Sequence, residues 1–381
     1  NEAAAAFANP AAPASPAAAT GDGMAAPGTV VGASAAREAP KRVATGANGA
    51  PLPDGMSILT QGDSDALLTF KDGTTNWEDL VSWGLKGWTD NSSPCVSWTG
   101  VTCSASKRVV ALDLSGWSVK GRLAPELAAM DELKTLNLSS CDLTGGLPPA
   151  WAAFPKLQTL DLSDNPRLAA DLPAGWAKKG ALPSLAILAL RNAGLAGPLP
   201  DEWATPSALK SLAVLDVSGN AVKGPLPEAW ADTEGAFKKL RVLNLADNSI
   251  GGPLPDSWGA SSATFPALTT LDQGRNLLAG PLPTAWGTSG GLAQLTELHL
   301  QLNRLVGRVP EEWGAPDTLP RLTWLDLYGN GLFGPIPSSW GLKGGGVSRL
   351  TVLSLRPGNP GLCGKVPPQL RSAAVDARAA A

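Results

Sequence analysis

The side chains that could support catalysis or metal binding are few. His299 is the only histidine among 381 residues, and the chain has four cysteines. No Ser or Cys lies in a nucleophile-elbow motif around which a catalytic triad could form. The glycine-rich run at 341–346 lacks the Lys-Ser/Thr pair of a phosphate-binding loop. We therefore expect no enzymatic activity, no cofactor and no metal site.

Carboxylates recur at one position of a repeated segment. Nearly every second predicted strand carries one: Asp113, Asp161, Asp216, Asp272 and Asp326. Neighbouring strands lie ~4.8 Å apart, so consecutive carboxylates of this column would be about 10 Å apart. Because that distance is too long for two of them to share a metal ion, we interpret the column as an acidic, solvated strip.

The segment that positions these residues is clearest at residues 240–258, which read LRVLNLADNSIGGPLPDSW. On a strand, Leu243 and Leu245 point to one face and Asn244 to the other. Asn248 follows where the chain turns away, and its amide can bond backbone groups that the turn leaves unpaired, forming a ladder with neighbouring copies. The same position holds Asn165, Asn220, Asn276, Asn303, Asn330 and Asn359.

The segment recurs at intervals of about 24 to 28 residues, which is the range of leucine-rich repeats. Such short strands cannot bury their apolar sides alone, but stacked copies build a continuous core beneath a parallel sheet. The first position of the segment falls at Val109, Leu133, Leu157, Leu185, Leu212, Leu240, Leu268, Leu295, Leu322 and Leu350.

The pattern LxxLxLxxNxLxGxLPxxW resembles the plant-type leucine-rich repeat over residues 63–370. The resemblance implies an α/β fold: a right-handed leucine-rich-repeat solenoid with a concave parallel β-sheet, an irregular or 3-10 convex side and a helical N-terminal cap. It also implies a second short sheet formed by the LxGxLP segment.

The chain departs from the family pattern at its last position, where Trp replaces the usual Leu. We interpret this column as structural, because such rings bury a large area and can leave the indole N–H at the rim of the core. Its members are Trp151, Trp176, Trp203, Trp230, Trp258, Trp286, Trp313 and Trp340.

The segment before the first repeat resembles the N-terminal cap of plant leucine-rich-repeat ectodomains, whose pattern runs DxxALLxFK, LxxW and CxWxGVxC. The last part reads CVSWTGVTC at residues 95–103 here, so its cysteines are one residue further apart than usual. Such a cap covers the open end of the apolar core. The resemblance implies a Cys95–Cys103 disulfide and hence an oxidising compartment. A zinc site is the rival, but the chain has no second cysteine pair and one histidine. Ser64 and Asp65 are predicted to cap the first helix of this segment.

The other two cysteines do not form an obvious pair. Cys141 occupies the ladder position of its repeat, where a buried thiol can replace the amide. Cys363 resembles the start of the family's C-terminal cap, but no second cysteine follows it. We expect Cys363 to be free or bonded to another chain, unless the chain has lost its end.

Composition divides the chain into four segments. We expect residues 1–60, rich in Ala, Pro and Gly, to be a disordered arm, because they cannot bury enough apolar surface to offset their ordering entropy. The arm is either a linker or processed leader, or a proline-rich stalk modified in a cell wall, or a segment that docks on a partner. The remaining segments are the cap at 61–107, about ten repeats at 108–370 and a C-terminal tail at 371–381.

Charge and hydropathy argue against two kinds of partner, nucleic acid and the interior of a membrane. The net charge of -3 gives no basic footprint, so we do not expect nucleic acid to bind. No run of about 20 apolar residues is present, so we expect no membrane span. The chain begins at Asn1 rather than Met, as it would after removal of a secretory signal.

The concave face of a solenoid is its usual binding surface, and the later strands carry the most distinctive side chains there. Exposed aromatics beside charged groups are typical of interface hot spots and of sugar-stacking platforms. Alternatively, these aromatics cover the end of the sheet or lie under the C-terminal region. The predicted ligand-binding residues are Glu297, His299, Gln301, Trp324, Asp326, Tyr328 and Arg356.

Three further positions stand out. Asn91 and Asn137 begin N-x-Ser sequons, and both are predicted glycosylation sites if the protein is secreted, with chance occurrence as the alternative. Gln273 replaces the second inward leucine of its strand, so it needs a hydrogen-bond partner inside the core.

The resemblance extends to receptor-like ectodomains and polygalacturonase-inhibitor proteins. It implies a secreted, non-enzymatic recognition module that binds a protein, a peptide or a wall polysaccharide through its concave face, at the cell surface or in the cell wall. The alternative is a structural component of an extracellular matrix, cell wall or cell-surface or ciliary assembly. The Trp column and the Ala/Pro-rich composition also fit a green-algal member of the family.

Overall fold

The computed structural model describes most of the chain beyond the leading segment. The predicted disordered arm lies outside the described residues, apart from its last three positions. The described residues are 58–205, 208–231, 237–288, 290–367, 370 and 374–375.

Three helices form the start of the described chain: α1 (Ile58–Asp72), α2 (Trp77–Ser82) and α3 (Pro94–Ser97). The prediction that Ser64 and Asp65 cap the first helix is wrong, because α1 begins at Ile58 and both residues lie inside it. Ser64 is 1% exposed, so it is a packed residue of the helix rather than a residue at its end.

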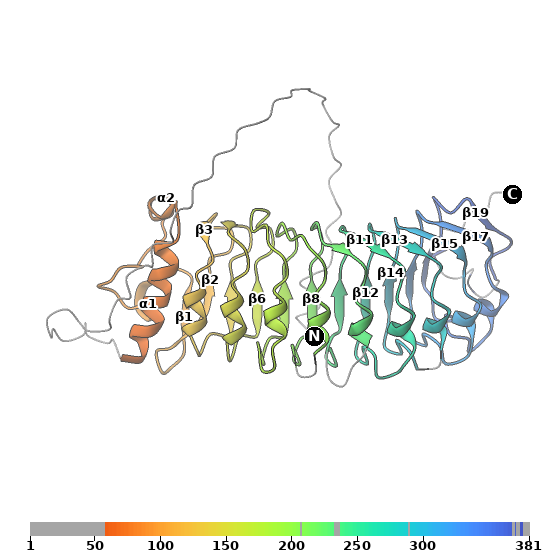
Figure 1. Ribbon diagram of the computed structural model, residues 1–381, viewed down its shortest axis with the longest axis horizontal. Helices are drawn as coiled ribbons and strands as arrows, with labels where there is room; N and C mark the ends of the chain where they lie inside the picture. Colours follow the sequence, from red (N-terminus) through yellow and green to blue (C-terminus); the bar gives the residue numbers. More distant parts are fainter. Residues whose placement is uncertain are drawn as a thin grey trace, which may run out of the picture. The chain divides into compact units, whose positions relative to one another are not determined.

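A 12-stranded sheet runs through the repeats, and Figure 1 shows its strands side by side. From β2 to β16, each strand leads into an arc with a short helical turn. β1 pairs antiparallel with β2. The later neighbours pair in parallel, as β10 does with β12. In sheet order the strands are β1 (Val101–Cys103), β2 (Val109–Asp113), β4 (Thr135–Asn137), β6 (Thr159–Asp161), β7 (Ile187–Ala189), β8 (Val214–Asp216), β10 (Val242–Asn244), β12 (Thr270–Asp272), β14 (Glu297–His299), β16 (Trp324–Asp326), β18 (Val352–Ser354) and β20 (Ala374–Val375).

The predicted second sheet is also present, in two parts. A two-stranded sheet pairs β3 (Lys120–Arg122) with β5 (Asp142–Thr144). A six-stranded sheet follows, in the order β19 (Gly361–Cys363), β17 (Gly331–Pro335), β15 (Arg304–Arg308), β13 (Leu277–Gly280), β11 (Ser249–Gly252) and β9 (Lys223–Gly224).

Single 3-10 turns close the arcs. They lie at η2 (Pro125–Ala129), η3 (Pro149–Ala153), η4 (Ala174–Ala177), η5 (Asp201–Ala204), η6 (Glu228–Ala231), η7 (Asp256–Gly259), η8 (Thr284–Gly287), η9 (Glu312–Gly314) and η10 (Ser338–Gly341).

The core lies between the 12-stranded sheet and the arcs. Leu243 is in register with Leu215 of β8 and Leu271 of β12, and these leucines are fully buried. Since side chains alternate along a strand, the residues on either side of each leucine face away from the core. We call this side of the 12-stranded sheet the outer face; it corresponds to the predicted concave face of the solenoid.

The predicted asparagine ladder is confirmed. Asn276 donates from Nδ2 to the carbonyl oxygen of Leu245 in the preceding coil (2.9 Å) and accepts at Oδ1 from the Ile250 N–H (3.0 Å). Cys141 takes the same position, and its Sγ lies 3.4 Å from the carbonyl oxygen of Leu114, one coil earlier. Burial raises the pKa of the Cys141 thiol, as expected for a structural cysteine.

The tryptophan column is structural, but its indole N–H groups do not lie at the rim. All eight rings are 0% exposed, and each N–H donates to a backbone carbonyl of the preceding coil at 2.8–3.3 Å. For Trp258 the acceptor is Pro227, and for Trp340 it is Pro310. A leucine at this position offers no donor, so the column forms a second ladder beside the asparagines.

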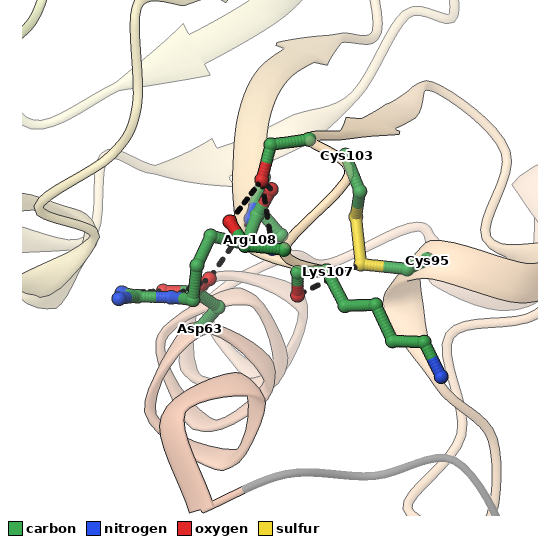
Figure 2. Close-up of a disulfide and its surroundings, with 8 residues drawn as sticks. Asp63, Cys95, Cys103, Lys107 and Arg108 are labelled. Atoms are coloured by element: carbon green, nitrogen blue, oxygen red, sulfur yellow. Dashed lines mark hydrogen bonds and ion pairs between the residues drawn. A yellow bond between two sulfur atoms is a disulfide. The ribbon is translucent and has the colours of Figure 1, made fainter.

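The predicted Cys95–Cys103 disulfide is present, with the two Cα atoms 5.5 Å apart (Figure 2). It ties α3 to β1. Nearby, the carboxylate of Asp63 on α1 is 1% exposed and accepts from both the Arg108 guanidinium and the Val109 N–H.

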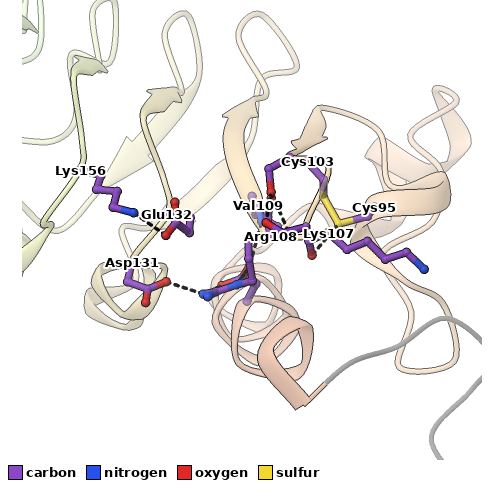
Figure 3. Close-up of polar contacts among 11 residues, drawn as sticks. Cys95, Cys103, Lys107, Arg108, Val109, Asp131, Glu132 and Lys156 are labelled. Atoms are coloured by element: carbon purple, nitrogen blue, oxygen red, sulfur yellow. Dashed lines mark hydrogen bonds and ion pairs between the residues drawn. A yellow bond between two sulfur atoms is a disulfide. The ribbon is translucent and has the colours of Figure 1, made fainter.

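Arg108 also contacts Asp131 in the arc after β2, so one guanidinium joins helix α1 to the first coil (Figure 3). The hydrogen bond with Asp63 raises the pKa of Arg108 above its ordinary value. The apolar core is thereby sealed at this end.

The predicted C-terminal tail contains a strand. Strand β20 falls within the predicted tail at 371–381 and extends the sheet by pairing with β18. Among the described residues, no helix is long and apolar enough to cross a membrane.

Candidate functional site

The outer face of β14 and β16 carries four of the seven predicted ligand-binding residues. Leu298, Leu325 and Leu353 are fully buried on the inner face. Their neighbours therefore face outward and lie in register: Glu297 beside Trp324, and His299 beside Asp326. The four side chains form one array across two neighbouring strands.

His299 is the centre of this array. Its Nε2 lies 3.6 Å from Oε2 of Glu297, and its ring centroid lies 5.7 Å from that of Trp324. Across the sheet its register partners are Asp272 on β12 and Asp326 on β16. One imidazole therefore lies among three carboxylates and one indole.

These neighbours change the acidity of the groups. Burial acts to lower the pKa of His299, but the close contact with Glu297 and the charges of Asp272, Glu297 and Asp326 outweigh it, so the pKa is raised. The same contact lowers the pKa of Glu297. Burial raises the pKa of Asp326 to about 6 and also raises that of Asp272.

Trp324 is the apolar member of the array, and it is exposed. Its residue surface is 40% exposed, whereas the tryptophans of the second ladder are fully buried. An exposed indole beside partly buried charged groups is the composition found at the centres of protein interfaces. Trp324 is therefore available to a ligand that approaches the outer face.

Gln301 and Tyr328 extend the array along their strands. A Cβ added at Gly274 would meet the amide of Gln301 at 2.4 Å, so this amide lies directly over Gly274 of the preceding coil. Oε1 of Gln301 is buried and has no hydrogen-bond partner among the described residues. Tyr328 is half-buried, and its N–H donates to Oδ1 of Asp326 (3.4 Å).

Arg356 has a backbone contact of its own. Its guanidinium donates to the carbonyl oxygen of Leu362 on β19, at 2.8 Å. This contact joins the end of β18 to the second sheet. Arg356 therefore has a structural role, whether or not it also reaches a ligand.

The predicted acidic strip is only partly solvated. Asp216 is 4% exposed and Asp326 is 9% exposed, so the description as a solvated strip is wrong for these two. Oδ1 of each of the five aspartates accepts the N–H two residues later, as Asp272 does from Gly274 (2.9 Å). Asn244 makes the same bond to Ala246, so the column caps strand ends.

Asp272 on β12 lies beside His299 but is not among the predicted ligand-binding residues, although it belongs to the predicted acidic strip. The signal that could have placed it at the site is its position one strand before His299, in the same column. Within the described ranges, no group of three His, Cys, Asp or Glu side chains is arranged to hold a metal ion.

The two sequons differ in their surroundings. Asn91 is exposed in the cap loop. Asn137 is half-buried on β4, and its Oδ1 accepts from the Ser139 N–H (3.1 Å) and hydroxyl (2.8 Å). Glycosylation at both positions stays a prediction.

Comparison with protein families supports this architecture. Residues 60–104 match the family described as "Leucine rich repeat N-terminal domain". Residues 131–178 match "Leucine Rich repeats (2 copies)", and residues 239–260 and 321–342 match "Leucine Rich Repeat".

Curated relatives from Arabidopsis thaliana share shorter stretches. The chain is 43% identical over 75 residues to the "LRR receptor-like serine/threonine-protein kinase FEI 2", which is 19% of this chain and 12% of that protein. It is 37% identical over 89 residues to "Protein MALE DISCOVERER 2", covering 23% of this chain and 12% of that protein. The chain thus matches about an eighth of each relative's length.

Solved structures share the fold over most of the described chain. The LRR ectodomain of GASSHO1/SCHENGEN3 from Arabidopsis thaliana, in complex with CASPARIAN STRIP INTEGRITY FACTOR 2, has a TM-score of 0.66 and 28% identity, over 82% of this chain and 34% of that one. The plant peptide hormone receptor RGFR1 in complex with RGF2 has a TM-score of 0.52 and 26% identity. The match covers 67% of this chain and 41% of that one. A plant ice-binding protein, at 22% identity and a TM-score of 0.63, shares the fold over 82% of this chain and 90% of its own.

Proposed function

We propose that this chain, a leucine-rich-repeat protein with a leucine-rich-repeat N-terminal domain, is a non-enzymatic extracellular recognition module. Its ligand is an extended peptide or protein segment, held on the outer face of β14, β16 and β18. The observation that carries the proposal is the exposed Trp324 beside His299, with Glu297 and Asp326 in the same array.

The array favours a ligand with a positive charge next to an apolar side chain. Ionised Glu297 and Asp326 attract an Arg, a Lys or an amino terminus, and the Trp324 face accepts either a cation or an apolar group. The LRR ectodomain of GASSHO1/SCHENGEN3 and the plant peptide hormone receptor RGFR1, which share this fold, form complexes with CASPARIAN STRIP INTEGRITY FACTOR 2 and RGF2 respectively. These complexes support a peptide or small protein as the class of ligand.

The extracellular location rests on the cap. A disulfide such as Cys95–Cys103 persists in oxidising compartments, and Asn91 and Asn137 are proposed to carry glycans there. The proposal includes membership of a larger assembly at the cell surface or in the wall.

Selection from a displayed library of linear peptides tests the proposed function. Wild type should enrich peptides that carry a basic residue beside an apolar one. Trp324→Ala and Asp326→Asn should lose that enrichment. Phe333→Ala is the matched control, since Phe333 is an aromatic residue of similar exposure (48%) on the second sheet. Equal enrichment by Trp324→Ala and Phe333→Ala would contradict the proposal.

One observation favours a second function, as a structural component of an extracellular assembly. Cys363 is exposed and unpaired among the described residues, and it lies on β19, the edge strand of the second sheet. Under that function, non-reducing electrophoresis of native material would show a covalent species that Cys363→Ser removes.

A further inference from the structure

A shallow, open groove lies at the junction between the cap and the first coil, far from the array just described. It has a volume of about 510 Å³ and is lined by Trp83, Ser115, Gly116, Trp117 and Ser118. Between β2, which leads into the groove loop, and β16 the sheet contains β4, β6, β7, β8, β10, β12 and β14. At ~4.8 Å per strand, the two sites are roughly 40 Å apart.

Two tryptophans form the apolar walls of the groove. Trp83 ends helix α2 and is 60% exposed, although the same cap buries Trp77, Trp88 and Trp98 to 8% or less. Trp117 is half-buried and packs against the core. The exposed Trp83 ring beside the half-buried Trp117 ring offers an apolar surface to a ligand in the groove.

The indole N–H groups and serine hydroxyls that line the groove can form hydrogen bonds with a ligand. In the part of the chain that the structure describes, the indole N–H groups of Trp83 and Trp117 have no hydrogen-bond partner, unlike those of the second ladder. The hydroxyls of Ser115 and Ser118 can each donate and accept. No charged side chain lines the groove.

The two walls are held in place relative to each other. Asn76 caps the start of α2 and is 6% exposed. Its Nδ2 donates to the carbonyl oxygen of Ser118 (3.0 Å), and its Oδ1 accepts from the Lys120 N–H (2.8 Å). A buried amide thus fastens the loop that carries Trp117 to the helix that carries Trp83.

The loop itself is fixed by backbone contacts. The Gly116 N–H donates to the carbonyl oxygen of Ser139 in the next coil (2.9 Å), and the Ser115 N–H donates to Oδ1 of Asp113 (3.0 Å). Ser118 has a φ of 55°, in the left-handed region that non-glycine residues rarely adopt. The groove is therefore a pre-formed feature, which lowers the entropic cost of binding.

We propose that this groove is a second binding site, for a neutral pyranose residue of an oligosaccharide. A pyranose ring has apolar C–H faces that fit against indole rings and hydroxyl edges that pair with serine hydroxyls and indole N–H groups. The absence of charged lining residues favours an uncharged sugar over a uronate. A proline-rich peptide can also use aromatic walls, and the experiment below separates the two.

The sugar has two possible sources with the same chemistry. One is a free oligosaccharide. The other is a glycan on Asn137, which is in register with Asp113 and lies one strand from the groove loop. Ser139→Ala removes the sequon and keeps the Asn137 side chain, so it distinguishes the sources.

The test is ligand-observed NMR with the whole chain, using cellohexaose, mannohexaose and maltohexaose as neutral probes. Hexagalacturonate is the charged comparison, and decaproline is the peptide comparison. Wild type, Ser139→Ala and Trp324→Ala should bind at least one neutral hexasaccharide. Trp83→Ala should weaken that binding by about tenfold or more, since one aromatic stacking platform is lost. Trp83 is exposed, so its replacement leaves the core intact.

Several results would overturn the proposal. They are no binding of a neutral hexasaccharide by Ser139→Ala, equal binding by Trp83→Ala and wild type, or Trp83-dependent binding of decaproline alone. If the glycosylated wild type and Trp324→Ala both fail to bind while the unglycosylated Ser139→Ala binds, the Asn137 glycan occupies the groove and the site is upheld. Trp324→Ala reports on the peptide site, so failure of that proposed function would leave this result unchanged.

Discussion

The indole N–H of Trp286 donates to the carbonyl oxygen of Pro255, 2.9 Å away and one coil earlier in the chain. The same relationship repeats through all eight tryptophans of the column. Each arc is therefore hydrogen-bonded to the arc before it, while the asparagine ladder joins the same coils on the other side of the core. Two ladders make the stability of each coil depend on its neighbours.

Trp286→Phe should lower the free energy of unfolding by about 1–3 kcal/mol, because the Pro255 carbonyl is left buried without its donor. Because Trp286 is fully buried, the measured loss includes the missing hydrogen bond and the small void left by the pyrrole ring. Urea unfolding followed by circular dichroism measures it. Trp324→Phe, at an exposed position without such a bond, should change stability by less than about 0.5 kcal/mol.

Gln273→Leu should stabilise the protein by about 1–3 kcal/mol. Gln273 is 0% exposed, and neither of its side-chain polar atoms has a partner among the described residues. Removing an unsatisfied buried amide recovers its desolvation cost. The unfolding midpoint in urea should rise. A fall in the midpoint would show that Gln273 does have a partner, such as a buried water.

Cys141→Asn should stabilise the second repeat by about 0.5–1.5 kcal/mol. At the same position Asn165 both donates to Leu138 (2.9 Å) and accepts from Leu143 (3.1 Å), whereas the thiol is a weak donor and acceptor. Native-state hydrogen exchange of the first coils is the measurement. Cys141→Ser, with a shorter side chain, should not reproduce the gain.

Asp326→Asn should change the pH dependence of stability. The folded pKa of Asp326, about 6, lies above its ordinary value of 3.8, so the folded state binds more protons between these two values. Wild-type stability therefore falls as pH rises from about 4 to 6. The variant lacks this loss, so its stability relative to wild type should increase by about 1–3 kcal/mol between pH 4 and pH 7.

Urea unfolding at both pH values measures this difference. Asn244→Ala removes a member of the same column that does not titrate, and its effect should be equal at both pH values. An Asp326→Asn effect that is also independent of pH would show that the carboxylate is already ionised at pH 4.

The repeats could be predicted in detail because every copy has the same spacing and the same alternation of apolar and polar residues along its strand. Leu243 and Asn248 behave as their positions in the pattern require. The start of α1 could not be predicted, since residue type alone does not tell a helix cap from a buried pair such as Asp63 and Arg108, which lie 45 residues apart.

The sites were predicted unequally. The outer-face array follows from strand register, which the repeat spacing supplies, and even Asp272 could have been placed by it. The groove could not be predicted, because it depends on the left-handed backbone at Ser118 and on the Asn76 amide, 42 residues away. The acceptor of each indole N–H could not be predicted either, because it is a backbone carbonyl of the preceding coil and residue type does not identify it.

The central claim is that a ligand binds to the outer face beside His299. Its most direct test is isothermal titration of a peptide selected by wild type into the Trp324→Ala/Tyr328→Ala variant, with Phe333→Ala as control. The account predicts a loss of affinity of at least about 30-fold in the double variant, as for hot-spot residues, and wild-type affinity in the control. Wild-type affinity in the double variant would contradict it.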